Sequence, residues 1–308
     1  MSVLVVGSLA YDSVDSPEGS IREALGGSAT YAGLACQFHL GRLNRPKASL
    51  VGVVGGDFGE RDRAILADAG LDLSGIQESE GKTFRWEGSY HGSMAEAVTK
   101  ATHLNVFEHF KPDIAKELST PQIVFCANLH PAIQASVMDQ TNPRRITMLD
   151  SMNLWIEIAQ PELLNVMQRS DLVIINDGEV RMLAGDDNIV RAMNTIASQT
   201  STATLVVKRG EHGVIALHQG QWIALPAYPS KDLTDPTGCG DSFAGSLAAY
   251  LSLCDGPITL EELKHGLAIA TVTASFTLAS FGTVSLRELT TERFEQRLAD
   301  YLAMVTLS

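Results

Sequence analysis

The chain has 308 residues, 45% of them hydrophobic, and its 36 acidic and 23 basic side chains give a formal charge of -13. Such a chain can fill a large core, which excludes disorder as its main state, and its acidic surface argues against a nucleic-acid partner. No stretch reaches the ~18 consecutive apolar residues of a membrane span. The four scattered cysteines lack metal-ligand spacing and suit a reducing cytoplasm.

Short aliphatic segments recur along the chain as buried parallel strands do. In chain order we expect strands at Val3 to Val6, Leu50 to Val54, Ile123 to Cys126, Ile146 to Leu149, Leu172 to Ile175 and Leu205 to Val207. Helical patterns lie between several of them, at Ala29 to His39, Arg61 to Ala69, Pro161 to Arg169 and Ile189 to Gln199. This alternation predicts an α/β fold with a doubly wound, mostly parallel sheet, which binds ligands at the carboxyl ends of its strands.

Two stretches, near residues 12 to 25 and 82 to 105, interrupt this alternation with polar and aromatic residues in turn, as in half-exposed strands. We interpret them as a small β lid on the substrate side; the alternative is a surface hairpin that does not contact substrate. Since no repeat, low-complexity tract or Pro-rich linker divides the chain, residues 1 to 308 are expected to form one domain with this lid. The apolar stretch from Gly266 to Phe281 is expected to be a packed helix.

A glycine-rich segment, D-P-T-G-C-G-D at residues 235 to 241, directly precedes an apolar helix expected at Phe243 to Leu253. Glycines allow backbone amides to converge at a helix N-terminus, where the free N–H groups and the helix dipole favour a phosphoryl group. The simpler interpretation is that Asp241 is only a helix N-terminal carboxylate.

This segment closely resembles the D-T-x-G-A-G-D signature of the ribokinase-like, PfkB-type carbohydrate kinase family. Other landmarks of that family recur in order along essentially the whole chain: G-S-L-A-Y-D at 7 to 12, G-G-S-A-T at 26 to 30, V-G-G-D-F-G at 54 to 59, N-D-G-E at 176 to 179 and V-K-R-G-E-H-G at 207 to 213. A P-loop sequence is absent, and so is a Rossmann fingerprint after the first strand.

The resemblance implies an ATP-dependent kinase that phosphorylates a hydroxyl of a small molecule, with Asp241 as the general base. Its anion hole would consist of the backbone amides of Gly238, Cys239, Gly240 and Asp241. A catalytic thiol at Cys239 is disfavoured, because no partner histidine is evident.

The resemblance also implies the sites of the donor and the ions. Mg²⁺ would be held through water by Asn176 and Glu179, and K⁺ by the loop that contains Asp235 and Thr237. ATP would lie against Lys208, Gly210 and Gly213, with the segment from Thr271 to Gly282 over its base. Lys208 replaces the usual threonine, so it either touches a phosphate or is a solvated lysine at a strand end.

On the acceptor side, the resemblance assigns substrate contacts to Asp12, Gly26, Gly27, Tyr31, Trp86 and Asn128. Ala10, Ser28 and Tyr31 replace an asparagine, a lysine and an asparagine of ribokinases, which argues against ribose itself. We expect a primary hydroxyl of a sugar or sugar acid as the acceptor. The nearest alternative is a nucleoside, because aromatic residues of the lid can stack on a base.

A different class of function is a ligand sensor that keeps the fold and has lost catalysis. The intact Asp241, Glu179 and glycine loop argue against it, and turnover that depends on an acceptor would separate the two. The resemblance also suggests a homodimer formed through the lid, which the sequence itself does not fix.

Overall fold

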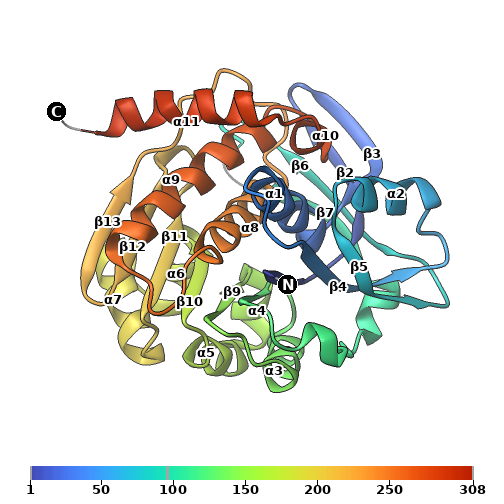
Figure 1. Ribbon diagram of the computed structural model, residues 1–308, viewed down its shortest axis with the longest axis horizontal. Helices are drawn as coiled ribbons and strands as arrows, with labels where there is room; N and C mark the ends of the chain where they lie inside the picture. Colours follow the sequence, from blue (N-terminus) through green and yellow to red (C-terminus); the bar gives the residue numbers. More distant parts are fainter. Residues whose placement is uncertain (1, 95–96, 307–308) are drawn as a thin grey trace.

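Nine strands form a large sheet at the centre of the molecule (Figure 1). The computed structural model describes residues 2 to 94 and 97 to 306. Within them, the sheet runs in the order β13 (Gln221–Leu225), β12 (Val214–His218), β11 (Thr204–Lys208), β10 (Leu172–Asn176), β9 (Ile146–Asp150), β8 (Ile123–Cys126), β1 (Val3–Val6), β4 (Ala48–Gly55) and β5 (Asp72–Ser79). Strands β5 through β11 in this order are parallel, and the β12–β13 hairpin adds two antiparallel strands.

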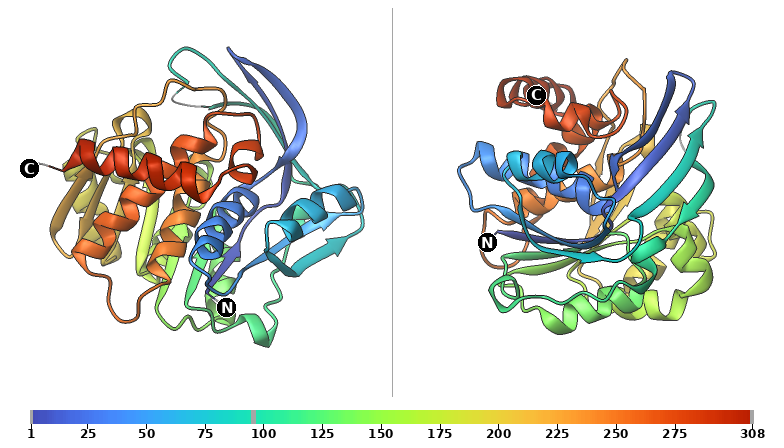
Figure 2. Two further views of the ribbon diagram at one scale, coloured as in Figure 1. Left: turned by 45° about the horizontal axis from the view of Figure 1, so that its top comes forward. Right: turned by 90° about the vertical axis from the view of Figure 1, so that its right-hand side faces the viewer.

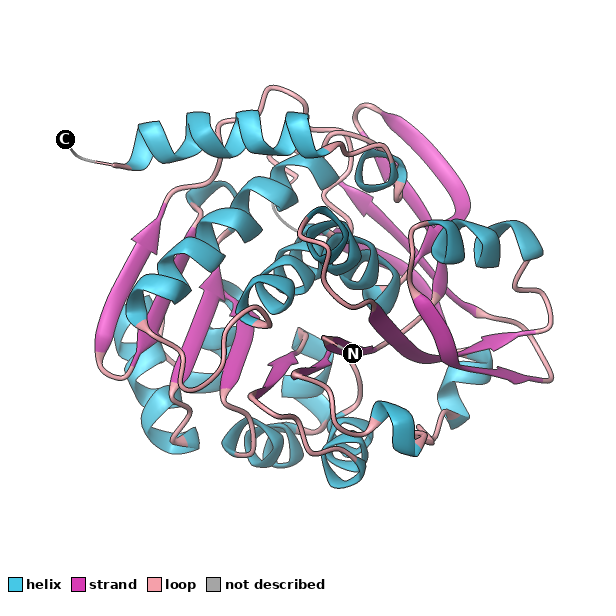
Figure 3. Cartoon of the chain, viewed as in Figure 1, coloured by secondary structure: helices cyan, strands magenta, loops and turns pink. Residues whose placement is uncertain are grey.

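Helices cover both faces of this sheet (Figures 2 and 3). One face carries α1 (Ser28–Arg42), α2 (Glu60–Asp68), α8 (Cys239–Leu251), α9 (Leu260–Thr277) and α10 (Val284–Arg287), with α11 (Thr291–Val305) packed on α9. The other carries α3 (Pro131–Gln140), α4 (Asn153–Ile158), α5 (Gln160–Gln168), α6 (Asp177–Ala184) and α7 (Ile189–Thr200). Short 3-10 turns complete the layers at η1 (Asn105–His109), η2 (Lys116–Leu118) and η3 (Gly210–His212).

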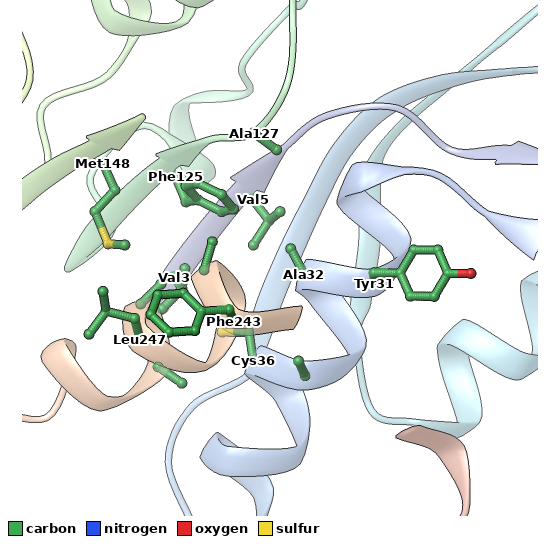
Figure 4. Close-up of a cluster of buried hydrophobic side chains, with 14 of the residues drawn as sticks. Val3, Val5, Tyr31, Ala32, Cys36, Phe125, Ala127, Met148, Phe243 and Leu247 are labelled. Atoms are coloured by element: carbon green, nitrogen blue, oxygen red, sulfur yellow. The ribbon is translucent and has the colours of Figure 1, made fainter. Parts of the chain in front are cut away.

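Alternate residues of one strand enter different cores. Val3 and Val5 pack with α1 and α8, whereas Leu4 and Val6 pack against the opposite layer with η1 and α3. Figure 4 shows the first of these cores, where the strand residues meet Phe243 of α8. A strand buried on both faces is apolar at every position, which explains why the aliphatic segments predicted these parallel strands.

A second sheet of four strands lies beside the carboxyl end of β1. Its order is β3 (Gly19–Gly26), β2 (Ala10–Ser16), β6 (Phe84–Tyr90) and β7 (Ala97–His103). These strands occupy both segments that we interpreted as a lid, and we call this sheet the lid; residues 95 and 96 of the second segment lie outside the described residues. The lid touches the rest of the chain where Ser16 Oγ donates to the Thr234 carbonyl oxygen at 2.8 Å.

The helix expected from Gly266 to Phe281 is shorter at its carboxyl end than the sequence indicated. Helix α9 stops at Thr277, and the carbonyl oxygen of Leu278 accepts hydrogen bonds from the Thr234 and Asp235 amides. The chain therefore turns away to build the loop before α8. None of the described helices combines the length and the apolar character that crossing a bilayer requires.

Candidate active site

Asp241 lies in the first turn of α8, at the carboxyl edge of the large sheet. Its side chain is half-buried. Burial, followed by the charge of Asp150, raises its pKa to about 6, and Lys208 acts in the opposite direction. A carboxylate with a pKa near neutrality can take a proton from an alcohol while that alcohol attacks.

Gly238 caps α8 in the left-handed conformation, with φ of 77°. A Cβ at this position would lie 2.3 Å from ring atoms of Tyr31, so the position excludes side chains for two separate reasons. Tyr31 therefore forms the floor beneath the start of α8. Its ring is packed against Gly238, and in Figure 4 its hydroxyl points away from the apolar core.

Among the described residues, two of the four amides expected in the anion hole have no other hydrogen-bond acceptor. The Cys239 amide instead donates to the Pro236 carbonyl oxygen at 3.1 Å, as part of the turn that leads into α8. Among the described residues, the amides of Gly238 and Gly240 donate to no other residue. The Cys239 thiol contacts the Ala274 carbonyl oxygen, and burial raises its pKa, which disfavours the thiolate that a nucleophile needs.

Lys208 reaches from the end of β11 into this site. Its Nζ lies 2.8 Å from Asp150 Oδ2, and its side chain is only 19% exposed, so the interpretation as a solvated lysine at a strand end is wrong. Burial lowers its pKa, but the charges of Asp150 and Glu179 outweigh burial and the net shift is upward. The ammonium therefore stays charged, and the acidic groups that act on it are Asp150, Glu179 and Asp241.

Asn176 and Glu179 form a capping box at the start of α6. Glu179 accepts from the Asn176 amide at 2.7 Å and from Asn176 Nδ2 at 2.6 Å, while its own amide donates to Asn176 Oδ1 at 2.8 Å. Burial raises the pKa of Glu179 to about 8. Each carboxylate oxygen retains acceptor capacity, so the pair suits contact with a hydrated cation through water. Within the described residues, no three metal-ligating side chains form a direct ligand set.

Asp12 lies near the start of the lid, and the residue is only 5% exposed. Its Oδ2 accepts from the Gly27 amide at 3.2 Å and lies 2.0 Å from where a Cβ at Gly26 would be. Burial, together with the charges of Asp241 and Asp235, raises its pKa to about 7. The twin glycines thus make room for a carboxylate that retains free acceptor capacity.

Asp235 and Thr237 lie in the loop that joins β13 to α8. Asp235 accepts from the amides of Thr237 at 2.9 Å and Gly282 at 3.3 Å. The Thr237 hydroxyl donates to the Tyr90 hydroxyl of the lid at 3.2 Å. One loop therefore links the lid, the segment after α9 and the glycine-rich turn.

Trp86 lies on the lid face that also carries Asp12, because the two residues are paired in the parallel β2–β6 register. A Cβ at Gly88 would be 2.2 Å from the Trp86 ring, which shows that the ring covers this glycine. Val14, Tyr90, Met94, Ile21 and Phe281 form an apolar cluster with it. The lid thus presents an aromatic surface beside the Asp12 carboxylate.

Asn128 follows β8, and its amide is already engaged. Trp155 Nε1 donates to Asn128 Oδ1 at 2.8 Å, and Asn128 Nδ2 contacts Met152 Sδ at 3.1 Å. No hydrogen bond between described residues connects Asn128 with Asp12 or Asp241. Asn128 was expected to contact the acceptor substrate, but no hydrogen bond between described residues joins it to the other residues expected to do so.

Gly210 and Gly213 shape the loop between β11 and β12. Gly213 has a φ of 85°, and a Cβ there would lie 2.1 Å from the Leu225 carbonyl oxygen. Gly210, with φ of 53°, faces open space. These glycines hold the loop in place just after Lys208.

Two residues of the site were not predicted from the sequence. One is Asp150, although a carboxylate that ends a central buried strand is itself a signal. Tyr90 was assigned to the lid, but nothing in its sequence context indicated a hydrogen bond to Thr237.

The arrangement as a whole is that of a phosphotransferase, with a carboxylate base and free amides at a helix N-terminus. The family model of the pfkB family carbohydrate kinases matches residues 2 to 289, and the chain belongs to this family. It is accordingly an ATP-dependent phosphotransferase with an alcohol group as acceptor, as the sequence analysis expected. Kinases of this family use ATP with Mg²⁺.

Characterised relatives include kinases of nucleosides and of sugars. A cytidine kinase from Thermococcus kodakarensis is 29% identical over 257 residues, 81% of this chain and 88% of its own length. A fructokinase from Klebsiella pneumoniae is 32% identical over 101 residues, 33% of each chain.

Solved structures share the fold at lower identity. The Burkholderia thailandensis nucleoside kinase in complex with inosine has a TM-score of 0.80 at 18% identity and 98% coverage of both chains. A fructokinase from Vibrio cholerae, with fructose, ADP and potassium ion bound, has a TM-score of 0.75 at 16% identity, covering 97% of this chain and 98% of its own.

Proposed function

We propose that this protein is a nucleoside kinase, which transfers the γ-phosphoryl group of ATP to the primary hydroxyl of a nucleoside. The observation that carries this proposal is the Trp86 surface on the same lid face as Asp12. A short carboxylate such as Asp12 accepts bonds from two neighbouring sugar hydroxyls, and an aromatic surface beside it suits a base attached to that sugar.

In the proposed reaction, Asp241 takes the proton of the acceptor hydroxyl as its oxygen attacks phosphorus and the bond to ADP breaks. The amides of Gly238, Gly240 and Asp241 stabilise the charge on the moving phosphoryl group. One such donor contributes roughly 3 kcal/mol in other enzymes.

The donor would lie along the ends of β9, β10 and β11, against Lys208, Gly210 and Gly213. Asn176 and Glu179 would hold a hydrated Mg²⁺, which supplies charge neutralisation between the phosphates. Asp235 and Thr237 lie in the loop proposed to hold K⁺. In this assignment Asp12, Gly26, Gly27 and Tyr31 bind the ribose and Trp86 the base, while Asn128 acts only through Trp155.

A free sugar is the second candidate, and the fructokinase relative favours it. A sugar needs Asp12 and Asp241 but gains little from Trp86. The two candidates therefore differ in what the loss of Trp86 does.

The test is an ADP-release assay with Mg·ATP and K⁺ against cytidine, inosine, other nucleosides, and free sugars and sugar acids. We expect turnover on a nucleoside, with ³¹P NMR placing the phosphate on the primary hydroxyl. Turnover on free sugars alone would replace the nucleoside by a sugar. An inert protein whose thermal stability still rises with a nucleoside would be a sensor.

Trp86→Ala is the decisive variant. We expect its KM for the nucleoside to rise about tenfold or more, because stacking on a base contributes ~1–3 kcal/mol. Trp222→Ala is the matched control, since Trp222 lies on the edge strand β13 and is exposed. Equal KM values for the two variants would count against the base-binding role of the lid.

A further inference from the structure

Lys208 points its ammonium group at the phosphate-binding end of α8. A Cβ added at Gly240 would lie 3.1 Å from Lys208 Nζ. Gly240 belongs to the first turn of α8, whose amides face the proposed phosphoryl position. The ammonium therefore lies directly beside these amides.

The ammonium has unused donor capacity. It carries three N–H groups, and among the described residues Asp150 is its one hydrogen-bond acceptor. Its side chain is largely removed from solvent. Open donors on such a group favour a further anionic partner.

Asp150 is rigidly held at the end of β9. It is paired with Ile174 in the sheet register, and its Oδ1 accepts from the Ser151 amide at 2.9 Å, which leaves Oδ2 for Lys208. The other carboxylates whose charges act on Lys208 are Glu179 and Asp241. Without Asp150, the ammonium could move onto Asp241 and occupy the oxygens that a base needs for its proton.

We infer that Lys208 is a catalytic cation that contacts the phosphoryl group during transfer, and that Asp150 is a positioning residue that holds it beside Gly240 and away from Asp241. This inference rests on the proposed phosphoryl transfer at α8. Lys208 keeps its protons throughout, and its charge offsets the negative charge on the transferring oxygens.

The experiment measures kcat and the KM for ATP of Lys208→Met, Asp150→Asn and the double variant, with the acceptor that the wild type uses. For Lys208→Met we expect kcat to fall about 100-fold, with much less change in KM, because the contact strengthens in the transition state. For Asp150→Asn we expect a fall of about tenfold.

The double variant tests the positioning role. It should match Lys208→Met, because Asp150 has nothing left to position. Loss equal to the product of the two single effects would overturn this role. Since the double variant removes both buried charges together, it leaves neither one unpaired, and it serves if a single variant does not fold.

Lys208→Arg keeps the charge and should recover at least about tenfold of the kcat lost in Lys208→Met. Lys264→Met, on an exposed position of α9, is the matched control and should behave as the wild type. Wild-type kcat in Lys208→Met, or equal kcat in the Met and Arg variants, overturns the inference and leaves the proposed function standing. A wild type inert on every acceptor instead overturns the proposed function, and the inference with it.

Discussion

The two sides of Asp241 differ in how fully their polar groups are paired. On the side of Lys208, the charged groups have partners: Lys208 forms an ion pair with Asp150, and Glu179 accepts hydrogen bonds from Asn176. On the side of the lid, Asp12 has a single amide donor among the described residues, and the buried Tyr31 hydroxyl has no partner there. The donor side is thus organised before ligand arrives, whereas the acceptor side is left to be completed by its substrate.

The largest effect should come from the residue that both sides share. Asp241→Asn keeps the shape of the side chain and removes the base, so we expect kcat to fall about 10²–10⁴-fold. This variant should still bind ATP, which can be measured as an increase in its melting temperature when ATP is added. A variant that loses ATP binding together with turnover would mean that Asp241 organises the donor side instead.

Gly238→Ala should damage both sides at once. The left-handed conformation and the contact with the Tyr31 ring together should cost about 2–5 kcal/mol in the free energy of unfolding. Chemical denaturation measures this cost. Gly256→Ala is a suitable control, because Gly256 also has a positive φ, of 78°, but faces open space. If Gly238→Ala lost no more free energy of unfolding than Gly256→Ala, the Tyr31 ring would have moved to accommodate the added methyl group.

On the acceptor side, Asp12 should make the stability of the protein depend on pH. Burial raises the pKa of Asp12 from its ordinary value of 3.8 to about 7 in the folded protein, so the folded state binds this proton more tightly than the unfolded state does. Its contribution to stability is therefore fully present below about pH 4 and is lost as the pH rises through 7. The melting temperatures of the wild type and Asp12→Asn, measured over a range of pH, should converge at low pH. At neutral pH the variant should have the higher melting temperature. A difference in melting temperature that stays constant with pH would contradict the raised pKa of Asp12.

The smallest effect, and the most diagnostic, belongs to Tyr31→Phe. Removing a buried hydroxyl without a partner should leave the free protein as stable as before or more stable by about 1 kcal/mol. The KM of the acceptor should nevertheless rise if the hydroxyl completes its hydrogen bonds with substrate. A destabilised variant with unchanged KM would show a purely structural hydroxyl.

The same contrast explains what could be predicted from the sequence. The buried strands and the glycine-rich turn were readable, because apolar segments and left-handed glycines have few structural alternatives. The partners of Lys208 were not readable, since its ion pair with Asp150 joins strands β9 and β11, whose residues are far apart in the chain. For Asn128, position suggested a substrate contact, but Trp155 on α4 donates a hydrogen bond to its side-chain oxygen Oδ1. Sequence thus indicated which residues gather at the sheet edge, and packing decided which of them remain free.

The contact between α1 and α8 limits which parts of this protein can move. A Cβ at Gly245 would lie 2.1 Å from the Ala32 carbonyl oxygen, so the two helices approach backbone to backbone. The loop that precedes α1 and the loop that precedes α8 are therefore carried by a single rigid body. Any motion during turnover should leave these two loops fixed relative to each other, and amide hydrogens along the α1–α8 contact should be among the last in the molecule to exchange with solvent.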